Sequence, residues 1–111
     1  MLDLSVFKKE YLEIKLFDGS VVNIGKPSQR LVIDMMAVQQ TFEDLNANPE
    51  NHKVEDILNE FNQILLKILN NNKEEKKFTI KYIESNFDLE IGNVFISEYM
   101  EFVNQIQNRK N

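Results

Sequence analysis

The side chains best suited to chemistry are scattered along the chain rather than gathered in a motif. His52 is the single histidine, in a polar segment without a cluster of metal ligands, so we interpret it as a surface residue rather than a ligand or general base. The acidic pairs Glu43-Asp44 and Glu55-Asp56 lie within predicted helices. Neighbouring residues on a helix point about 100° apart, so neither pair can act together on one substrate.

The chain also lacks the glycine and cysteine patterns of catalytic and metal sites. Its three glycines, Gly19, Gly25 and Gly92, are too far apart for a phosphate-binding loop, and no serine has the glycine neighbours of a nucleophile elbow. There is no cysteine, which excludes disulfides, thiolate zinc sites and cysteine nucleophiles. We therefore predict no catalytic residue, no cofactor and no metal, in a protein that is not an enzyme.

Length and charge restrict the class of protein further. With 111 residues, 42% of them hydrophobic, the chain suits one domain with an ordinary core. A net charge of −5, with Arg30 and Arg109 as the only arginines, argues against a nucleic-acid partner. The apolar runs are far shorter than the twenty or so residues of a membrane span, and the first residues lack the pattern of a secretory signal. We therefore expect a cytoplasmic protein without membrane contact.

Apolar side chains alternate with polar ones over residues 11–24, which predicts a β-hairpin. A two-residue turn would divide the apolar side chains between the two faces. A three-residue turn with Gly19 in the left-handed conformation pairs Ile14 with Val22 and places them all on one face, so we predict this register. A lone hairpin is only marginally stable in water, and this face must therefore rest on helices. Its apolar residues are Leu12, Ile14, Leu16, Val22 and Ile24.

Helical periodicity predicts four helices, over about residues 28–45, 54–69, 79–86 and 88–107. Ser28, Thr79 and Asp88 are the predicted N-caps, because their side-chain oxygens can accept hydrogen bonds from the first helical turn. The polar stretch 70–77 is predicted to be a solvated connection with no side chain facing the core. Residues 1–9 fit both a strand and a short helical turn, and both alternatives stay open.

Each long helix carries an apolar stripe that must face the hairpin or another helix. The sequence therefore predicts an α+β fold that is mainly α, with an N-terminal β-hairpin followed by three to four helices in a small bundle, as a single domain over residues 1–111. Gly92 weakens the helical pattern near the start of the last helix. The predicted stripes are Leu31, Met35, Val38, Phe42 and Leu45 in the first helix, Val54, Ile57, Leu58, Phe61, Ile64, Leu65, Ile68 and Leu69 in the second, and Ile91, Phe95, Tyr99, Phe102 and Ile106 in the last.

Three helices carry apolar side chains outside these stripes. At about 100° per residue they lie too far around the helix to share its core face. One reading is that they pack on another element of the same domain. The other is that they form a surface for a partner or for a second copy, with the methionines as adaptable contacts. The partner-binding candidates are Val32, Met36, Leu66, Ile96, Met100 and Val103.

Two stretches of this layout resemble the tail assembly chaperones of long-tailed bacteriophages and prophages of Gram-positive bacteria. Residues 16–28 (LFDGSVVNIGKPS) are similar to the opening of that family, with a strand, an Asp-Gly turn, a second strand and Lys-Pro-Ser before a helix. Residues 96–103 (ISEYMEFV) are similar to its terminal helix. The resemblance implies a non-enzymatic protein that binds the tape measure protein and helps recruit tail tube subunits.

Two further possibilities stay open beside this resemblance. A small acidic regulatory or adaptor protein, which occupies a cationic surface on a protein partner through its acidic helices, would have the same composition. Copies of the chain could also satisfy the extra apolar edges by associating with one another, so a homo-oligomer is an additional expectation.

Overall fold

The fold was examined in a computed structural model that describes residues 1–2, 10–48, 50 and 53–108. The alternatives for residues 3–9 and the interpretation of His52 concern positions outside the described residues. The chain forms a two-stranded hairpin followed by four helices, which confirms the predicted α+β, mainly α class. The elements are β1 (Tyr11–Lys15), β2 (Val21–Gly25), α1 (Gln29–Ala47), α2 (Val54–Asn70), α3 (Ile80–Asn86) and α4 (Leu89–Asn108).

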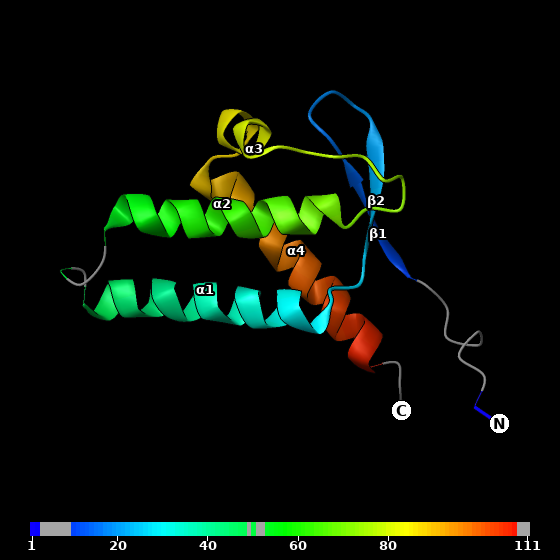
Figure 1. Ribbon diagram of the computed structural model, residues 1–111, viewed down its shortest axis with the longest axis horizontal. Helices are drawn as coiled ribbons and strands as arrows, with labels where there is room; N and C mark the ends of the chain where they lie inside the picture. Colours follow the sequence, from blue (N-terminus) through cyan, green and yellow to red (C-terminus); the bar gives the residue numbers. More distant parts are fainter. Residues whose placement is uncertain (3–9, 49, 51–52, 109–111) are drawn as a thin grey trace.

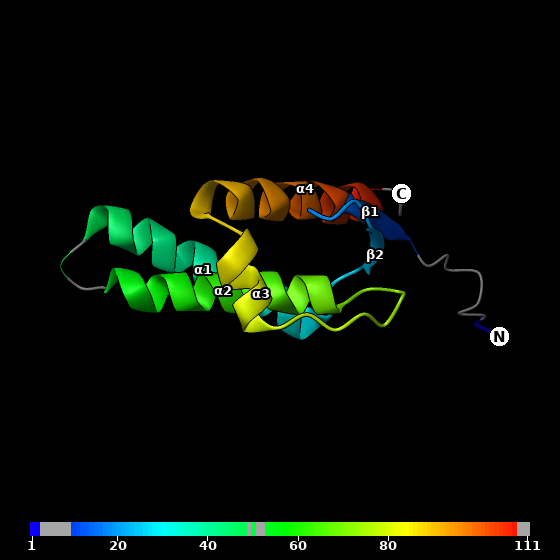
Figure 2. The same ribbon diagram turned by 90° about the horizontal axis from the view of Figure 1, so that it is seen from above.

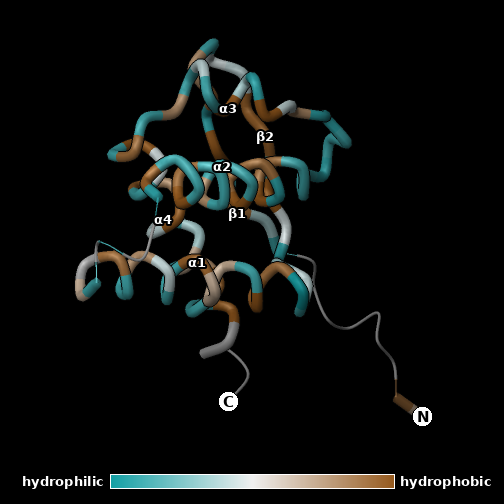
Figure 3. The backbone as a smooth tube through the Cα atoms, turned by 60° about the vertical axis from the view of Figure 1, so that its left-hand side comes forward, coloured by the Kyte–Doolittle hydropathy of each residue, from teal (hydrophilic) through white to brown (hydrophobic). Residues whose placement is uncertain are grey.

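The two central helices form an antiparallel pair, and the other elements are arranged around it. α1 and α2 lie side by side, and the hairpin stands across the end of α2 (Figure 1). α4 runs along one side of the pair, and α3 connects α2 to it (Figure 2). Hydrophobic and hydrophilic segments alternate along α1 and α2, as expected for helices with one buried face (Figure 3).

The hairpin adopts the predicted register. Ile14 lies opposite Val22, and Leu12 lies opposite Ile24. The turn contains three residues, with Gly19 at a φ of 89°, a left-handed conformation that glycine adopts without steric cost. Its closing hydrogen bonds run from the Leu16 N–H to the Ser20 carbonyl at 2.7 Å and from the Gly19 N–H to the Leu16 carbonyl at 2.9 Å. The apolar side chains therefore share the face that packs on the helices.

The predicted N-caps begin three of the helices. The Ser28 hydroxyl accepts from the Leu31 N–H at 3.1 Å, and the Thr79 hydroxyl accepts from the Tyr82 N–H at 3.2 Å. The Asp88 carboxylate does the same for the Ile91 N–H at 2.7 Å. Each side chain satisfies a backbone donor that has no partner within its helix.

The core joins the hairpin to all four helices. Tyr99 of α4 is completely buried and donates its hydroxyl hydrogen to the Gly25 carbonyl at 2.9 Å, so it links α4 to the end of β2. Burial raises the pKa of Tyr99 to about 12. The buried apolar residues of the core are Leu16, Val22, Ile24, Leu31, Met35, Val38, Phe61, Ile64, Leu65, Ile68, Leu69, Phe78, Ile83, Phe95, Tyr99 and Val103.

The buried face of α4 differs from the predicted stripe. Ile91 was expected in the core but is 38% exposed, and Val103 takes a core position instead. The cause is Gly92, which faces Phe61 and Leu65 of α2 so closely that a β-carbon there would meet both side chains. α4 contacts α2 at Gly92, so Gly92 belongs to the buried face of the helix. Because glycine has no side chain, the apolar pattern of the sequence does not show that this position is buried.

The prediction of a solvated connection over residues 70–77 fails at Asn72, while the other residues of this stretch are exposed. Asn72 is buried, and its side chain donates to the carbonyls of Leu69 and Lys76, each at 2.7 Å, and accepts from the Lys76 N–H at 2.8 Å. Glu74 accepts from the backbone and side-chain nitrogens of Asn23 at 2.8 and 2.7 Å. This polar connection therefore packs along β2 because its amide and carboxylate groups replace the hydrogen bonds of water.

Replacing Gly92 with alanine should destabilise the fold although alanine is the better helix former. The new β-carbon would lie 2.5 Å from Cε1 of Phe61, whose buried ring has little room to move. Overpacking should outweigh the gain in helix propensity and lower the free energy of unfolding by about 1–2 kcal/mol. Urea unfolding measures this, with Asn104→Ala on the exposed face of α4 as the control. An equal or higher stability of Gly92→Ala would contradict the close approach.

Asn72→Ala should lower the free energy of unfolding by about 2–3 kcal/mol, because buried backbone groups of the connection lose their partners. Lys77→Ala, at an exposed position of the same connection, is the control and should change stability by less than about 0.5 kcal/mol. Chemical denaturation of both variants would decide the matter. Equal effects of the two substitutions would show that the Asn72 hydrogen bonds contribute little.

Candidate partner-binding grooves

The structure places the six predicted partner-binding residues in different environments. Met36 is 56% exposed on α1, and Val32 is half-buried one turn before it. Val103 is 8% exposed and belongs to the core, so its assignment to a partner surface is wrong. The rotation of α4 around Gly92 explains this, since Val103 now faces inward. Three of the candidates are partly buried and pack against the core: Leu66, Ile96 and Met100.

A groove of about 350 Å³ lies between α1 and α4 and will be called the α1–α4 groove. Its floor contains Phe42 and Phe61, whose rings meet edge to face with their centroids 5.5 Å apart. Aromatic rings in this arrangement offer a rigid apolar surface. The residues of the groove are Met35, Val38, Gln39, Phe42 and Glu43 from α1, Phe61 and Ile64 from α2, and Asn93, Ile96 and Ser97 from α4.

One predicted candidate lines this groove, and three others share a helical stripe with one of its lining residues. Ile96 lines it directly, and Met100 follows one turn later on the same stripe of α4. On α1, Val32 and Met36 share a helical stripe with Gln39, which also lines the groove. Ile96 is thus the candidate that lines the groove, and the exposed Met36 lies on the helical stripe of α1 that continues from Gln39.

A second groove, of about 540 Å³, separates the hairpin turn from the first half of α4 and will be called the hairpin groove. Phe17 is 53% exposed at one side, and Val94 is 60% exposed at the other. The Phe17 ring meets Phe87 edge to face at 5.2 Å between centroids. The lining residues are Ile14, Lys15, Leu16, Phe17, Phe87, Asp88, Glu90, Ile91, Val94, Phe95 and Glu98.

Sequence reasoning missed the hairpin groove. Its exposed apolar surface on α4 depends on the outward rotation of Ile91, which was assigned to the core. The sequence nevertheless contains a pattern that could have indicated this groove, since Ile91 and Val94 are three residues apart and share one side of the helix with Glu98. Phe17 is the other signal, because a large apolar residue at the tip of a hairpin is unusual unless something covers it.

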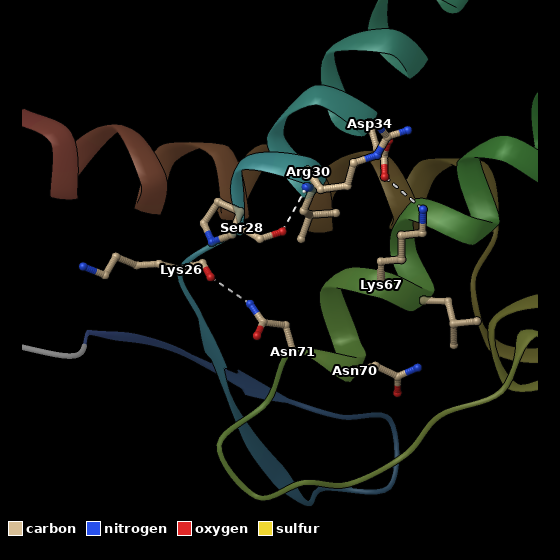
Figure 4. Close-up of a pocket in the computed structure, with 10 residues that line it drawn as sticks. Lys26, Ser28, Arg30, Asp34, Lys67, Asn70 and Asn71 are labelled. Atoms are coloured by element: carbon tan, nitrogen blue, oxygen red, sulfur yellow. Dashed lines mark hydrogen bonds and ion pairs between the residues drawn. The ribbon is translucent and has the colours of Figure 1, made fainter.

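A third, polar pocket of about 580 Å³ lies between the start of α1 and the end of α2 (Figure 4). Two of its cations are paired with one carboxylate, because Arg30 Nε is 3.2 Å and Lys67 Nζ is 2.9 Å from oxygens of Asp34. The hydrogen bond from Lys67, together with the charge of Arg30, lowers the pKa of Asp34. The Asn71 side chain donates to the Lys26 carbonyl at 2.8 Å. We interpret these contacts as a link between α1 and α2 rather than a ligand site.

Among the residues that the structure describes, no group of three His, Asp or Glu side chains is placed to hold a metal ion. None of the described helices is both long enough and apolar enough to cross a membrane.

Asp34→Asn should reduce stability at neutral pH. The pKa of Asp34 is lower in the folded protein, so its ion pairs add stability above the pKa of the unfolded chain, about 3.9, and lose it as the pH falls through the folded-state pKa. The difference from the unmodified protein should therefore be largest near pH 7 and shrink below pH 4. Denaturation across pH 3–7 measures it, with Glu60→Gln at an exposed carboxylate of α2 as the control. A difference independent of pH would contradict the assignment.

Comparison of the chain with protein-family models, curated proteins and solved structures gave no match. Its function is therefore inferred below from its surfaces and from the sequence resemblance described above.

Proposed function

We propose that this protein is a non-enzymatic assembly chaperone that holds an aggregation-prone amphipathic helix of a protein partner in the α1–α4 groove. The resemblance of residues 16–28 and 96–103 to phage tail assembly chaperones suggests the partner, which would be the tape measure protein. In this proposal the complex then recruits tail tube subunits, and its place of action is the cytoplasm of the infected cell.

The observation that supports this proposal best is the composition of the α1–α4 groove. The partly buried ring of Phe42, held edge to face by the buried Phe61, suits the apolar side chains of a partner helix. In this proposal the partner helix extends beyond the groove to Met36 and Met100, which share helical stripes with Gln39 and Ile96 and have flexible side chains that adjust to different partner residues. Gln39 and Glu43 supply the polar edge that surrounds the apolar centre of most protein interfaces.

The net charge of the chain fits the same role. At −5, the protein repels other copies of the complex and helps to keep an apolar partner in solution. A regulatory adaptor that binds a cationic surface is the second candidate, and the exposed acids Glu55, Asp56 and Glu60 on α2 favour it. The two candidates respond differently to salt, because exposed charge contacts are screened by ions and buried apolar contacts are not.

The test is co-expression with the longest reading frame immediately downstream in the native DNA. We expect that product to be soluble and to co-purify only when this chain is present, with capture that persists at high salt. A downstream product that is soluble alone and is not retained would overturn the tail-chaperone proposal. Capture that disappears as salt is raised would favour the adaptor.

Met36→Asp should weaken that capture by at least about tenfold, because in this proposal a carboxylate would replace an apolar contact to the partner helix on the stripe of α1 that contains Gln39. Met36 is 56% exposed, so the variant should fold normally by circular dichroism. The matched control is Val54→Asp, at a 63% exposed position in the first turn of α2 away from the groove. Undiminished capture by Met36→Asp, or an equal loss with Val54→Asp, would exclude the α1–α4 groove as the binding site.

A further inference from the structure

The two outer edges of the hairpin differ in whether their backbone groups have hydrogen-bond partners. The outer edge of β2 is closed by the segment that follows α2 (Figure 1). The Gly25 N–H donates to the Asn71 carbonyl, and the Lys73 N–H donates to the Asn23 carbonyl, both at 2.8 Å. The Asn23 N–H is satisfied by the Glu74 carboxylate, also at 2.8 Å. This edge therefore has no room for another strand.

The outer edge of β1 has no strand paired to it among the described residues. In an antiparallel pair, the backbone groups of successive residues point alternately toward the partner strand and away from it. Asn23 directs its groups away from β1, so Glu13, which lies opposite Asn23, directs its own away from β2. Lys15 does the same two residues later. Among the described residues, none forms a hydrogen bond with these outward backbone groups of Glu13 and Lys15.

The apolar face of the hairpin is also less completely buried at β1 than at β2. Val22 and Ile24 of β2 are 1% and 0% exposed, whereas Leu12 and Ile14 of β1 are only partly buried. The hairpin groove continues this open surface beyond β1, with Phe17, Ile91 and Val94 exposed. An unpaired strand edge beside exposed apolar side chains is the arrangement that accepts an added strand.

We infer that the occupant of this edge is a second copy of the chain, paired antiparallel through β1 with Ile14 at the two-fold axis. In this register Glu13 of each copy lies opposite Lys15 of the other, which forms two pairs of opposite charge. Both residues have outward backbone groups, so they also form the hydrogen-bonded pairs of the new ladder. The interface is isologous, as a closed dimer requires.

The charge pattern selects this register over its neighbours. Moving the pairing by one hydrogen-bonded step in one direction places Glu13 opposite Glu13, and moving it in the other places Lys15 opposite Lys15. Like charges directly opposite each other destabilise a strand pair. On the apolar face, the selected register brings Ile14 against Ile14 and Leu12 against Leu16, so one apolar surface continues across both hairpins.

Charge reversal tests the pairing directly. Glu13→Lys places two lysines opposite each other, and Lys15→Glu places two glutamates opposite each other. Each variant should associate at least about tenfold more weakly than the unmodified chain when mass is followed by sedimentation over a dilution series at low salt. An equimolar mixture of the two variants restores both opposite-charge pairs and should form a heterodimer. The double variant E13K/K15E should likewise recover the dimer.

A proline variant separates backbone pairing from charge. Glu13→Pro removes one outward N–H without touching the β1–β2 ladder, because that N–H points away from β2. It should abolish the dimer, whereas Glu13→Ala keeps the N–H and should retain part of the association. Circular dichroism and urea unfolding identify any variant that has lost its fold, and the mixing experiment does not depend on the proline variant.

Several outcomes would overturn the inference. A mass that stays monomeric at every concentration would do so. A dimer whose affinity is unchanged by Glu13→Lys and Lys15→Glu, or an equimolar mixture of these variants that does not associate, would do so as well. A monomer in which the same reversals weaken capture of the co-expressed partner would assign the edge to a foreign strand instead. The dimer is independent of the α1–α4 groove, so its failure would leave the proposed chaperone function untouched, and Met36→Asp should not change the mass.

Discussion

The closure of β2 by the segment that leaves α2 is the contact on which the exposed surface of the molecule depends. A two-stranded hairpin has two unsatisfied edges and one apolar face, and it is not stable alone. Here residues 71–74 supply backbone and side-chain partners for one edge, while Tyr99 donates to the Gly25 carbonyl where that edge ends. β2 is thus paired on both sides, and among the described residues β1 is the strand whose outer edge is unpaired.

The rotation of α4 about its axis is the second feature that determines the exposed surface, because this helix forms one wall of both grooves. Gly92 allows this helix to lie against Phe61, and that contact fixes its rotation about its axis. Ile96 then faces α1, Ile91 and Val94 face the hairpin turn, and Val103 faces the core. A single missing side chain thus decides which apolar residues of α4 are buried and which remain open to a partner.

The parts of the fold that obey local rules could be predicted from the sequence, and the parts that depend on distant contacts could not. Turn chemistry at Gly19 and the side-chain oxygens of Ser28 and Asp88 act on residues within four positions, so the hairpin register and the helix starts follow from the pattern. The rotation of α4 requires Phe61 from another helix, and the burial of Asn72 requires a backbone that only the folded connection provides.

The same division applies to the candidate sites. The spacing along α1 places Met36 outside the core stripe of that helix and left both internal packing and a partner surface open, and the structure shows the side chain exposed. Val103 was misplaced because its orientation depends on Gly92, and the hairpin groove was missed for the same reason. Apolar side chains outside a helical stripe therefore indicate that a second contact exists, and only the tertiary fold tells whether that contact is internal.

The hydrogen bond from Tyr99 to Gly25 joins residues 74 positions apart, and this separation has a consequence for how the chain matures during synthesis. The hairpin and the α1–α2 pair are formed by nearby segments and can assemble early, whereas α4 must be translated before that bond can close. Both grooves have α4 as a wall, so neither exists on the nascent chain until this helix has docked. A partner that binds in either groove therefore finds its binding surface only after α4 has been translated and has docked.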